Sequence, residues 1–175
     1  MPHLNIEVKA RCNQPEFIRE YLQKNDAILK GTDIQTDTYF NVSNGRLKLR
    51  EGNIENSLIW YARADVPGVK ESNFELVQVP AAEKLKDVLT RSLGVKIIVQ
   101  KTRQIWFIKN AKFHIDEIQG LGSFVEIEAS NLYAHLAREE LKQQCDFYMG
   151  ELGISSDDLL SVSYSDMLLS PERKS

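Results

Sequence analysis

The chain has 175 residues, which fits one domain with a sizeable core. Hydrophobic residues make up 42% and charged residues 27%, with 9 Gly and 5 Pro, so the composition excludes a disordered or collagen-like chain. The chain has 22 Lys and Arg and 25 Asp and Glu, and the resulting net charge of −3 argues against nucleic-acid binding through a basic surface.

The sequence shows no sign of a membrane segment or an export signal. No apolar run approaches the roughly 18 residues of a membrane span, and residues 1–9 lack the apolar core of a signal peptide. Cys12 and Cys145 have neither CxxC spacing nor a nearby His pair, so we interpret both as reduced thiols. We therefore expect a cytoplasmic protein without membrane association.

Hydrophobic periodicity predicts an alternation of strands and helices. Residues 4–13 alternate between apolar and charged side chains and predict a strand, and Pro15 then begins a helix to about residue 26. Asn44-Gly45 is a hairpin signal, and Pro67-Gly68 marks a turn between two further strands. The same signals predict strands at 35–42, 46–51, 58–65, 73–79, 95–109, 112–119 and 123–129 and helices at 80–93 and 133–152. After these come a short helical piece at 157–160, an ambiguous segment at 162–169 and a polar end.

The charged residues of these strands fall on one face of each strand. The sets are Glu7, Lys9 and Arg11; Arg46, Lys48 and Arg50; Lys101 and Arg103; Lys112, His114 and Asp116; and Glu126 and Glu128. One interpretation is an open sheet whose charged face lies in water. The other is a sheet that curls into a barrel, with the charged faces inside and the helices outside. The pattern alone leaves both open.

The barrel interpretation has a consequence for ligands. Its interior would hold eight or nine cations beside four carboxylates, and buried charges need partners. An anionic ligand is then implied, and Arg and Lys clusters favour a polyphosphate. Glu126 and Glu128 would be hard oxygen ligands for Mg²⁺ or Mn²⁺.

The motifs resemble those of a known family. Asn5-Ile6-Glu7-Val8-Lys9 is similar to the ExExK signature of the CYTH superfamily, the triphosphate tunnel metalloenzymes, which includes class IV adenylate cyclases and thiamine triphosphatases. The resemblance covers residues 4–169 and is strongest to the class IV cyclase-like branch. The other matching segments, in the family's order, are 37–40, 45–50, 61–65, 70–72, 101–103, 114–118, 120–124, 126–128 and 163–166.

The resemblance implies an α+β fold: an eight-stranded antiparallel β tunnel with a charged interior and helices packed outside. We expect one domain over residues 1–169 and a flexible tail at 170–175. The implied function is a metal-dependent enzyme that converts ATP to cyclic AMP and pyrophosphate. Alternatives are a triphosphatase acting on inorganic, nucleoside or thiamine triphosphate, and a non-catalytic nucleotide or polyphosphate binder. The partner is a small-molecule triphosphate (ATP, tripolyphosphate or thiamine triphosphate), and the protein is a monomer or homodimer.

The resemblance also implies roles for residues. The metal, Mg²⁺ or Mn²⁺, would be held by Glu7, Glu126 and Glu128, with Asp116 as a further ligand or a water-orienting base. Phosphates would contact Lys9, Lys48, Arg50, Arg63, Lys70, Lys101 and Arg103, and Asp116 and Lys9 would be catalytic. Asn5 departs from the signature, because it replaces the first Glu with an uncharged amide. We interpret His114 as a hydrogen-bonded structural histidine, with a proton shuttle as the alternative.

Overall fold

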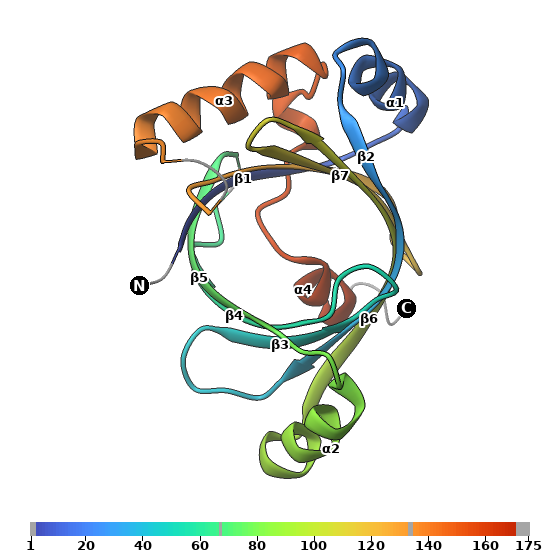
Figure 1. Cartoon of the computed structure of the whole chain (residues 1–175), viewed down its shortest axis with the longest axis vertical. Helices are drawn as coiled ribbons and strands as arrows, with labels where there is room; N and C mark the ends of the chain where they lie inside the picture. The colour runs from blue at the N-terminus through green and yellow to red at the C-terminus, as the bar shows by residue number, and fades with distance from the viewer. Residues whose placement is uncertain (1–2, 67, 133–134, 171–175) are drawn as a thin grey trace.

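The computed structural model describes residues 3–66, 68–132 and 135–170. Eight antiparallel strands form a closed barrel in the order β1-β5-β4-β3-β2-β6-β7-β8, seen end-on in Figure 1. The strands are β1 (His3–Arg11), β2 (Ile28–Phe40), β3 (Arg46–Glu51), β4 (Ser57–Arg63), β5 (Lys70–Gln78), β6 (Val95–Ile108), β7 (Ala111–Ile118) and β8 (Gly122–Ser130). The predicted eight-stranded antiparallel fold is confirmed.

The longest strand pair, β2 with β6, begins earlier than the sequence indicated. The prediction started β2 at residue 35, whereas pairing with β6 extends back to Ile28. A register shift between Leu29 and Gly31 interrupts the alternation, and Gly31 has a φ of +145°. A bulge of this kind hides the period-two pattern on which the prediction depended.

The larger of two buried apolar clusters lies outside the barrel wall, under two helices. Helices α1 (Pro15–Lys24) and α3 (Arg138–Glu151) lie on the same side of the barrel in Figure 1. Leu22, Leu141 and Cys145 from these helices belong to one buried cluster with Ile6 and Val8 of β1. Burying this face leaves the alternate side chains of each strand pointing into the barrel.

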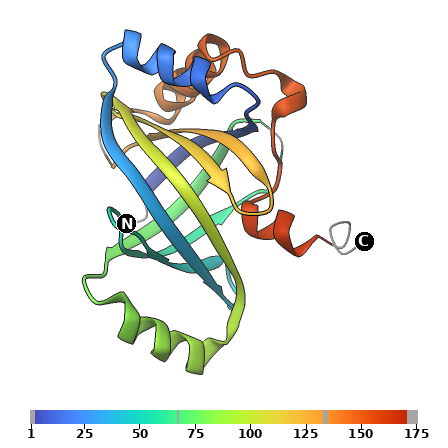
Figure 2. The same ribbon diagram turned by 90° about the vertical axis from the view of Figure 1, so that its right-hand side faces the viewer.

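The remaining helices lie at other positions on the barrel. Helix α2 (Ala82–Leu93) connects β5 to β6 at the opposite side from α1 and α3, as Figures 1 and 2 show. Helix α3 begins five residues later than predicted, and residues 133–134 of that prediction lie outside the described residues. A short 3-10 turn, η1 (Ser156–Asp158), occupies the start of the short helical piece predicted at 157–160.

Helix α4 (Tyr164–Leu169) resolves the ambiguous segment at 162–169. Ser163 caps the helix, because its Oγ accepts a hydrogen bond from the backbone N–H of Asp166 at 3.2 Å. Figures 1 and 2 place α4 at one mouth of the barrel, and Tyr164 is only 4% exposed there. The predicted flexible tail at 170–175 lies outside the described residues from residue 171 onward.

Among the residues that the structure describes, no helix has both the length and the apolar character needed to cross a membrane.

The position of α3 gives a stability prediction. Leu141 is fully buried between the helix and the barrel, so Leu141→Ala should lower the free energy of unfolding by about 2–5 kcal/mol. Val88 lies on α2 with 61% of its surface exposed, and Val88→Ala should change it by about 0.5 kcal/mol or less. Urea denaturation of both variants measures the difference, and equal effects would contradict the packing of α3.

Candidate active site

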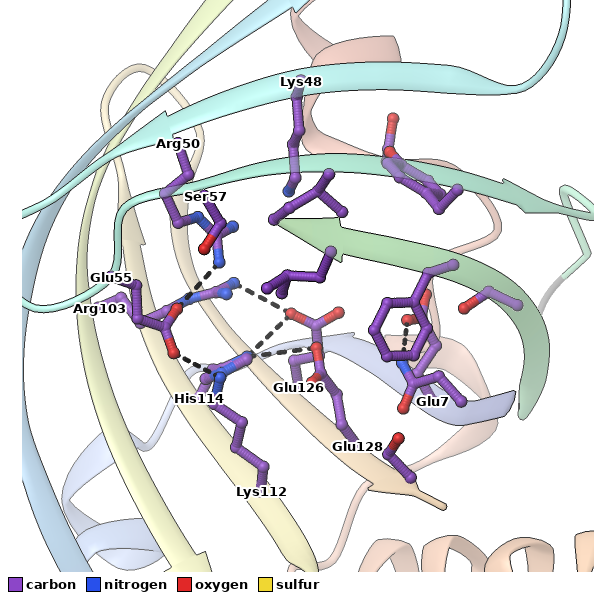
Figure 3. Close-up of a pocket in the computed structure, with 18 of the residues that line it drawn as sticks. Glu7, Lys48, Arg50, Glu55, Ser57, Arg103, Lys112, His114, Glu126 and Glu128 are labelled. Atoms are coloured by element: carbon purple, nitrogen blue, oxygen red, sulfur yellow. Dashed lines mark hydrogen bonds and ion pairs between the residues drawn. The ribbon is translucent and has the colours of Figure 1, made fainter. Parts of the chain in front are cut away.

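The barrel interior contains a cavity of about 600 Å³, shown in Figure 3. Its lining includes all but one of the predicted phosphate-binding residues: Lys9, Lys48, Arg50, Arg63, Lys101 and Arg103. The predicted metal ligands Glu7, Glu126 and Glu128 line it too. Lys70 and Asp116 are buried but do not line this cavity. The second of the two interpretations, in which the charged faces point inward, is therefore the correct one.

Asp37 of β2 holds three of the cations in place. Its carboxylate accepts hydrogen bonds from Lys48 Nζ at 3.0 Å, from Lys101 Nζ at 2.8 Å, and from Nε and Nη2 of Arg50, both at 2.9 Å. Burial alone would raise the pKa of Asp37, but Arg50, Lys101 and Lys48 hold this pKa well below its usual range. Asp37 therefore positions three inward cations at once.

This role of Asp37 was not predicted from the sequence. The available signal was its spacing: Asp33, Gln35 and Asp37 are two positions apart, so the three polar side chains lie on the same face of β2. All three side chains are buried, with exposures of 1% or less.

Glu55 is a second interior carboxylate that the sequence analysis missed. It comes from the loop between β3 and β4 and accepts hydrogen bonds from Lys112 Nζ at 2.7 Å and Arg50 Nη1 at 3.1 Å, as Figure 3 shows. Burial would raise the pKa of Glu55, but Lys112 and Arg50 lower it far below its usual range. No periodic signal marks a loop residue, which is why strand parity could not find it.

The loop that carries Glu55 is fixed by Asp33. The buried carboxylate of Asp33 accepts from the backbone N–H groups of Ile54 at 2.9 Å and Glu55 at 3.0 Å. Gly52 makes this approach possible, because a Cβ at that position would lie 2.5 Å from Asp33 Oδ1. The Glu55 carboxylate is therefore held inside the barrel by the backbone of its own loop.

Asp116 lies behind Arg103 and does not face the cavity. Its two oxygens accept from Arg103 Nε and Nη2, both at 2.6 Å, and Oδ2 also accepts from the Tyr164 hydroxyl at 2.8 Å. Burial would raise the pKa of Asp116, but Arg103 lowers it to about 2. Both oxygens are thus occupied, and the carboxylate fixes the guanidinium that lines the cavity.

A group of acidic residues and one histidine lines another part of the wall. Glu126 and Glu128 of β8 lie next to His114 of β7, with one ligand atom of each residue within 4.8 Å of the others. Glu128 also pairs in register with Glu7 of β1, which accepts from Asn5 Nδ2 at 3.0 Å and forms an ion pair with Arg63. Burial and the neighbouring Glu126 raise the pKa of Glu128 to about 7. Two neighbouring carboxylates, one buried and one half-buried, fit a divalent cation, which would stabilise both in their ionised form.

The interior carboxylates reduce the predicted excess of positive charge. The sequence analysis counted four carboxylates, and Asp37 and Glu55 add to them. Lys9 pairs with Glu126 at 3.3 Å, and the predicted phosphate contact Lys70 donates to the carbonyl of Ser161 at 2.7 Å. A polyphosphate in this cavity would share its cations with carboxylates of the wall.

The buried ion pairs predict a large effect of removing one partner. Arg103→Ala leaves Asp116 and Glu126 without their guanidinium, so we expect the free energy of unfolding to fall by about 3–5 kcal/mol. Arg138 forms an exposed pair with Glu71, and Arg138→Ala is the matched control that should leave stability nearly unchanged. Chemical denaturation compares the two, and similar losses would show that the interior pairs are not compensating buried charge.

Lys70 predicts a dependence of stability on alkaline pH. Burial, together with nearby Arg63, lowers the pKa of Lys70 from 10.5 to about 8. Between pH 8 and 10.5 the unfolded chain then binds more protons at this residue, so the free energy of unfolding should rise with pH. Lys70→Met removes this contribution. The free energy of unfolding of the wild type should therefore rise by pH 10 relative to that of the variant. Urea titrations at pH 7.5, 9 and 10 measure it, and parallel curves would contradict the shift.

Comparison with known proteins agrees with this geometry. The chain is 23% identical over 174 residues to “Putative adenylate cyclase MJ0240” of Methanocaldococcus jannaschii, covering 94% of this chain and 98% of that protein. The structure of a “putative adenylate cyclase” from Vibrio parahaemolyticus matches with a TM-score of 0.77 at 15% identity, covering 97% of this chain and all of that one. A “putative adenylyl cyclase” from Hippeastrum, described as having a dominant triphosphatase activity, matches with a TM-score of 0.61 at 12% identity, covering 95% and 94%.

The model of the CYTH domain matches residues 3–164, which is nearly the whole chain and includes every strand of the barrel. Proteins with this domain bind triphosphate substrates, and the family implies dependence on a divalent metal. The signature residues Glu7 and Lys9 lie on the inner face of the tunnel. This chain belongs to the CYTH domain family.

Proposed function

We propose that this protein is a divalent-metal-dependent enzyme that acts on a nucleoside triphosphate inside the tunnel, converting ATP to cyclic AMP and pyrophosphate. The observation that carries this proposal is the division of the cavity wall into a charged part and an apolar part. A charged wall alone would suit inorganic tripolyphosphate equally well. The apolar part gives a reason to expect a nucleoside.

The apolar part of the wall lies on β4 and β5. Ile59 is directly paired with Leu76, and Tyr61 is directly paired with Phe74, and all four side chains line the cavity. Aromatic and aliphatic side chains of this kind contact bases through stacking and apolar packing. The triphosphate would then lie against the cations of β1, β3 and β6.

The residues of the charged part have distinct proposed roles. Phosphate oxygens would be bound by the cavity-lining cations Lys9, Lys48, Arg50, Arg63, Lys101 and Arg103. We also assign Lys9 the catalytic role that the family resemblance implies; its Nζ lies 3.3 Å from Glu126 and 4.1 Å from the centre of the Tyr164 ring. Asp116 acts through Arg103 as a positioning residue, because both of its oxygens are already engaged. Lys70 lies outside the cavity and would act indirectly.

Glu7, Glu126 and Glu128 would hold Mg²⁺ or Mn²⁺. A bound divalent metal supplies positive charge that stabilises negative charge on phosphate oxygens. In the cyclisation, the ribose 3′-hydroxyl gives up its proton to water, its oxygen forms a bond to the α-phosphorus, and the bond from that phosphorus to the leaving pyrophosphate breaks. The fixed cations of the wall stabilise the charge that develops on the pyrophosphate, and their ion pairs with Asp37 and Asp116 hold them in place before the reaction.

A triphosphatase is the second candidate, because the Hippeastrum protein with this fold is described as having a dominant triphosphatase activity. Hydrolysis and cyclisation use the same phosphate-binding wall and differ in the nucleophile. The products therefore separate the two reactions.

The assay incubates the protein with ATP, tripolyphosphate or thiamine triphosphate in the presence of Mg²⁺ or Mn²⁺ and resolves the products. Cyclic AMP and pyrophosphate from ATP support the proposal, whereas orthophosphate indicates a triphosphatase. Glu126→Gln should reduce turnover strongly in either case, because it removes a charge from the metal group, which we define as Glu126, Glu128 and His114 with the neighbouring Glu7. Triphosphate binding without turnover across both metals would instead indicate the non-catalytic binder, which the uncharged Asn5 would explain.

The apolar wall yields its own prediction. Phe74→Ala should lower kcat/KM for ATP about tenfold, which corresponds to the loss of roughly 1.4 kcal/mol of base contact. The inhibition constant of tripolyphosphate against ATP should stay within twofold, since tripolyphosphate has no base. Phe147 is exposed on α3, so Phe147→Ala is the control and should change neither constant. Equal losses for ATP and tripolyphosphate would contradict a base site at Phe74.

A further inference from the structure

His114 is the only side chain of the metal group that offers a nitrogen, within the part of the chain that the structure describes. It is 1% exposed and lies on the inner face of β7, directly opposite Glu126 of β8. Figure 3 shows its ring directed toward Glu126 and Glu128. A buried imidazole beside one buried and one half-buried carboxylate is a mixed nitrogen and oxygen donor set, which is different chemistry from carboxylates alone.

The distances are those of ligands that share one ion. His114 Nδ1 lies 3.2 Å from Glu126 Oε2 and 3.7 Å from Glu128 Oε1. Neighbouring ligands of an octahedral ion with bonds near 2.1 Å are about 3 Å apart, and opposite ligands are about 4.2 Å apart. The three donor atoms are therefore already close enough together to bind one ion, without any shift in the pairing of β7 with β8.

The carboxylates of this site already have partners on both sides. Glu7 forms an ion pair with Arg63 and accepts a hydrogen bond from Asn5, which brings no charge. Glu126 pairs with Lys9 and Arg103, so an ion would share this carboxylate with two cations. What distinguishes the β7–β8 side is the nitrogen of His114.

We infer that His114 Nδ1 is a metal ligand together with Glu126 and Glu128, and that this nitrogen makes the site prefer Mn²⁺ over Mg²⁺. The inference rests on the proposed metal-dependent function and names one further ligand of that site. Mg²⁺ strongly prefers oxygen ligands. Mn²⁺ also binds carboxylates well, but as a first-row transition ion it accepts an imidazole nitrogen more readily than Mg²⁺ does. The competing role for His114 is to orient Glu126 through a hydrogen bond without contacting the ion.

Metal binding without substrate separates the two roles. Protein loaded with Mn²⁺ alone should show, in electron spin-echo envelope modulation, the coupling of a directly bound ¹⁴N nucleus. Labelling the histidines with ¹⁵N should change that coupling, and His3→Asn should not, because His3 lies outside the metal group. This measurement needs no substitution in the tunnel. Modulation from protons only would overturn the inference.

Affinities give a second, independent readout. His114→Asn replaces the nitrogen with an amide oxygen, so the Mn²⁺ dissociation constant should rise at least about tenfold while that of Mg²⁺ stays within about twofold. An orienting histidine predicts an equal loss for both metals, and this result would overturn the inference. His3→Asn is the matched control, and thermal melting shows whether each variant is folded. Neither measurement uses a nucleotide. If Mn²⁺ is bound through nitrogen but the protein shows no turnover, the proposed function is refuted and this inference stands.

Discussion

The compensation of charges buried inside a closed wall is the constraint on which this structure depends. A barrel that encloses so many ionisable groups is stable only where most of its charges meet an opposite charge at hydrogen-bond distance. Asp37 meets this demand for three cations, and Asp116 and Glu126 meet it for Arg103. The tunnel is therefore an ordered network before any ligand enters, and a ligand binds by exchanging partners within it.

The same constraint explains why the larger apolar cluster lies outside. Strand parity divides each strand into a charged and an apolar face, so a charged interior leaves the apolar faces to be covered from without. Ile6 and Val8 of β1 are covered by α1 and α3. Lys9, which lies between Val8 and Ala10, points into the tunnel. The helices thus stabilise the wall without contributing side chains to most of the cavity. Tyr164 of α4 is the exception, because its side chain lines the cavity at the mouth of the barrel and donates a hydrogen bond to Asp116.

Much of this arrangement was predictable from the sequence. Alternation predicted that Lys48 and Arg50, like Lys101 and Arg103, share one face of their strand, because side-chain direction in a strand follows directly from position. That this face is the inner one followed from the family resemblance and not from the alternation. Pairing was harder to predict, since parity does not show that Asp116 lies behind Arg103 and is shielded from the cavity. Glu55 lies in a loop, where no period exists, and its place depends on a contact with Asp33 that is distant in sequence. The start of β2 was hidden by the bulge at Gly31.

The place of β1 in the barrel has a consequence for how the chain folds. β1 is synthesised first but pairs with β5 on one side and β8 on the other, and Leu4 and Ser130, 126 positions apart, are joined by a hydrogen bond. Contacts of such long sequence separation slow folding, because a large loop must close before any of them forms. On the ribosome, β1 must wait for β8 to emerge. Glu7 meets Glu128 only at this last closure.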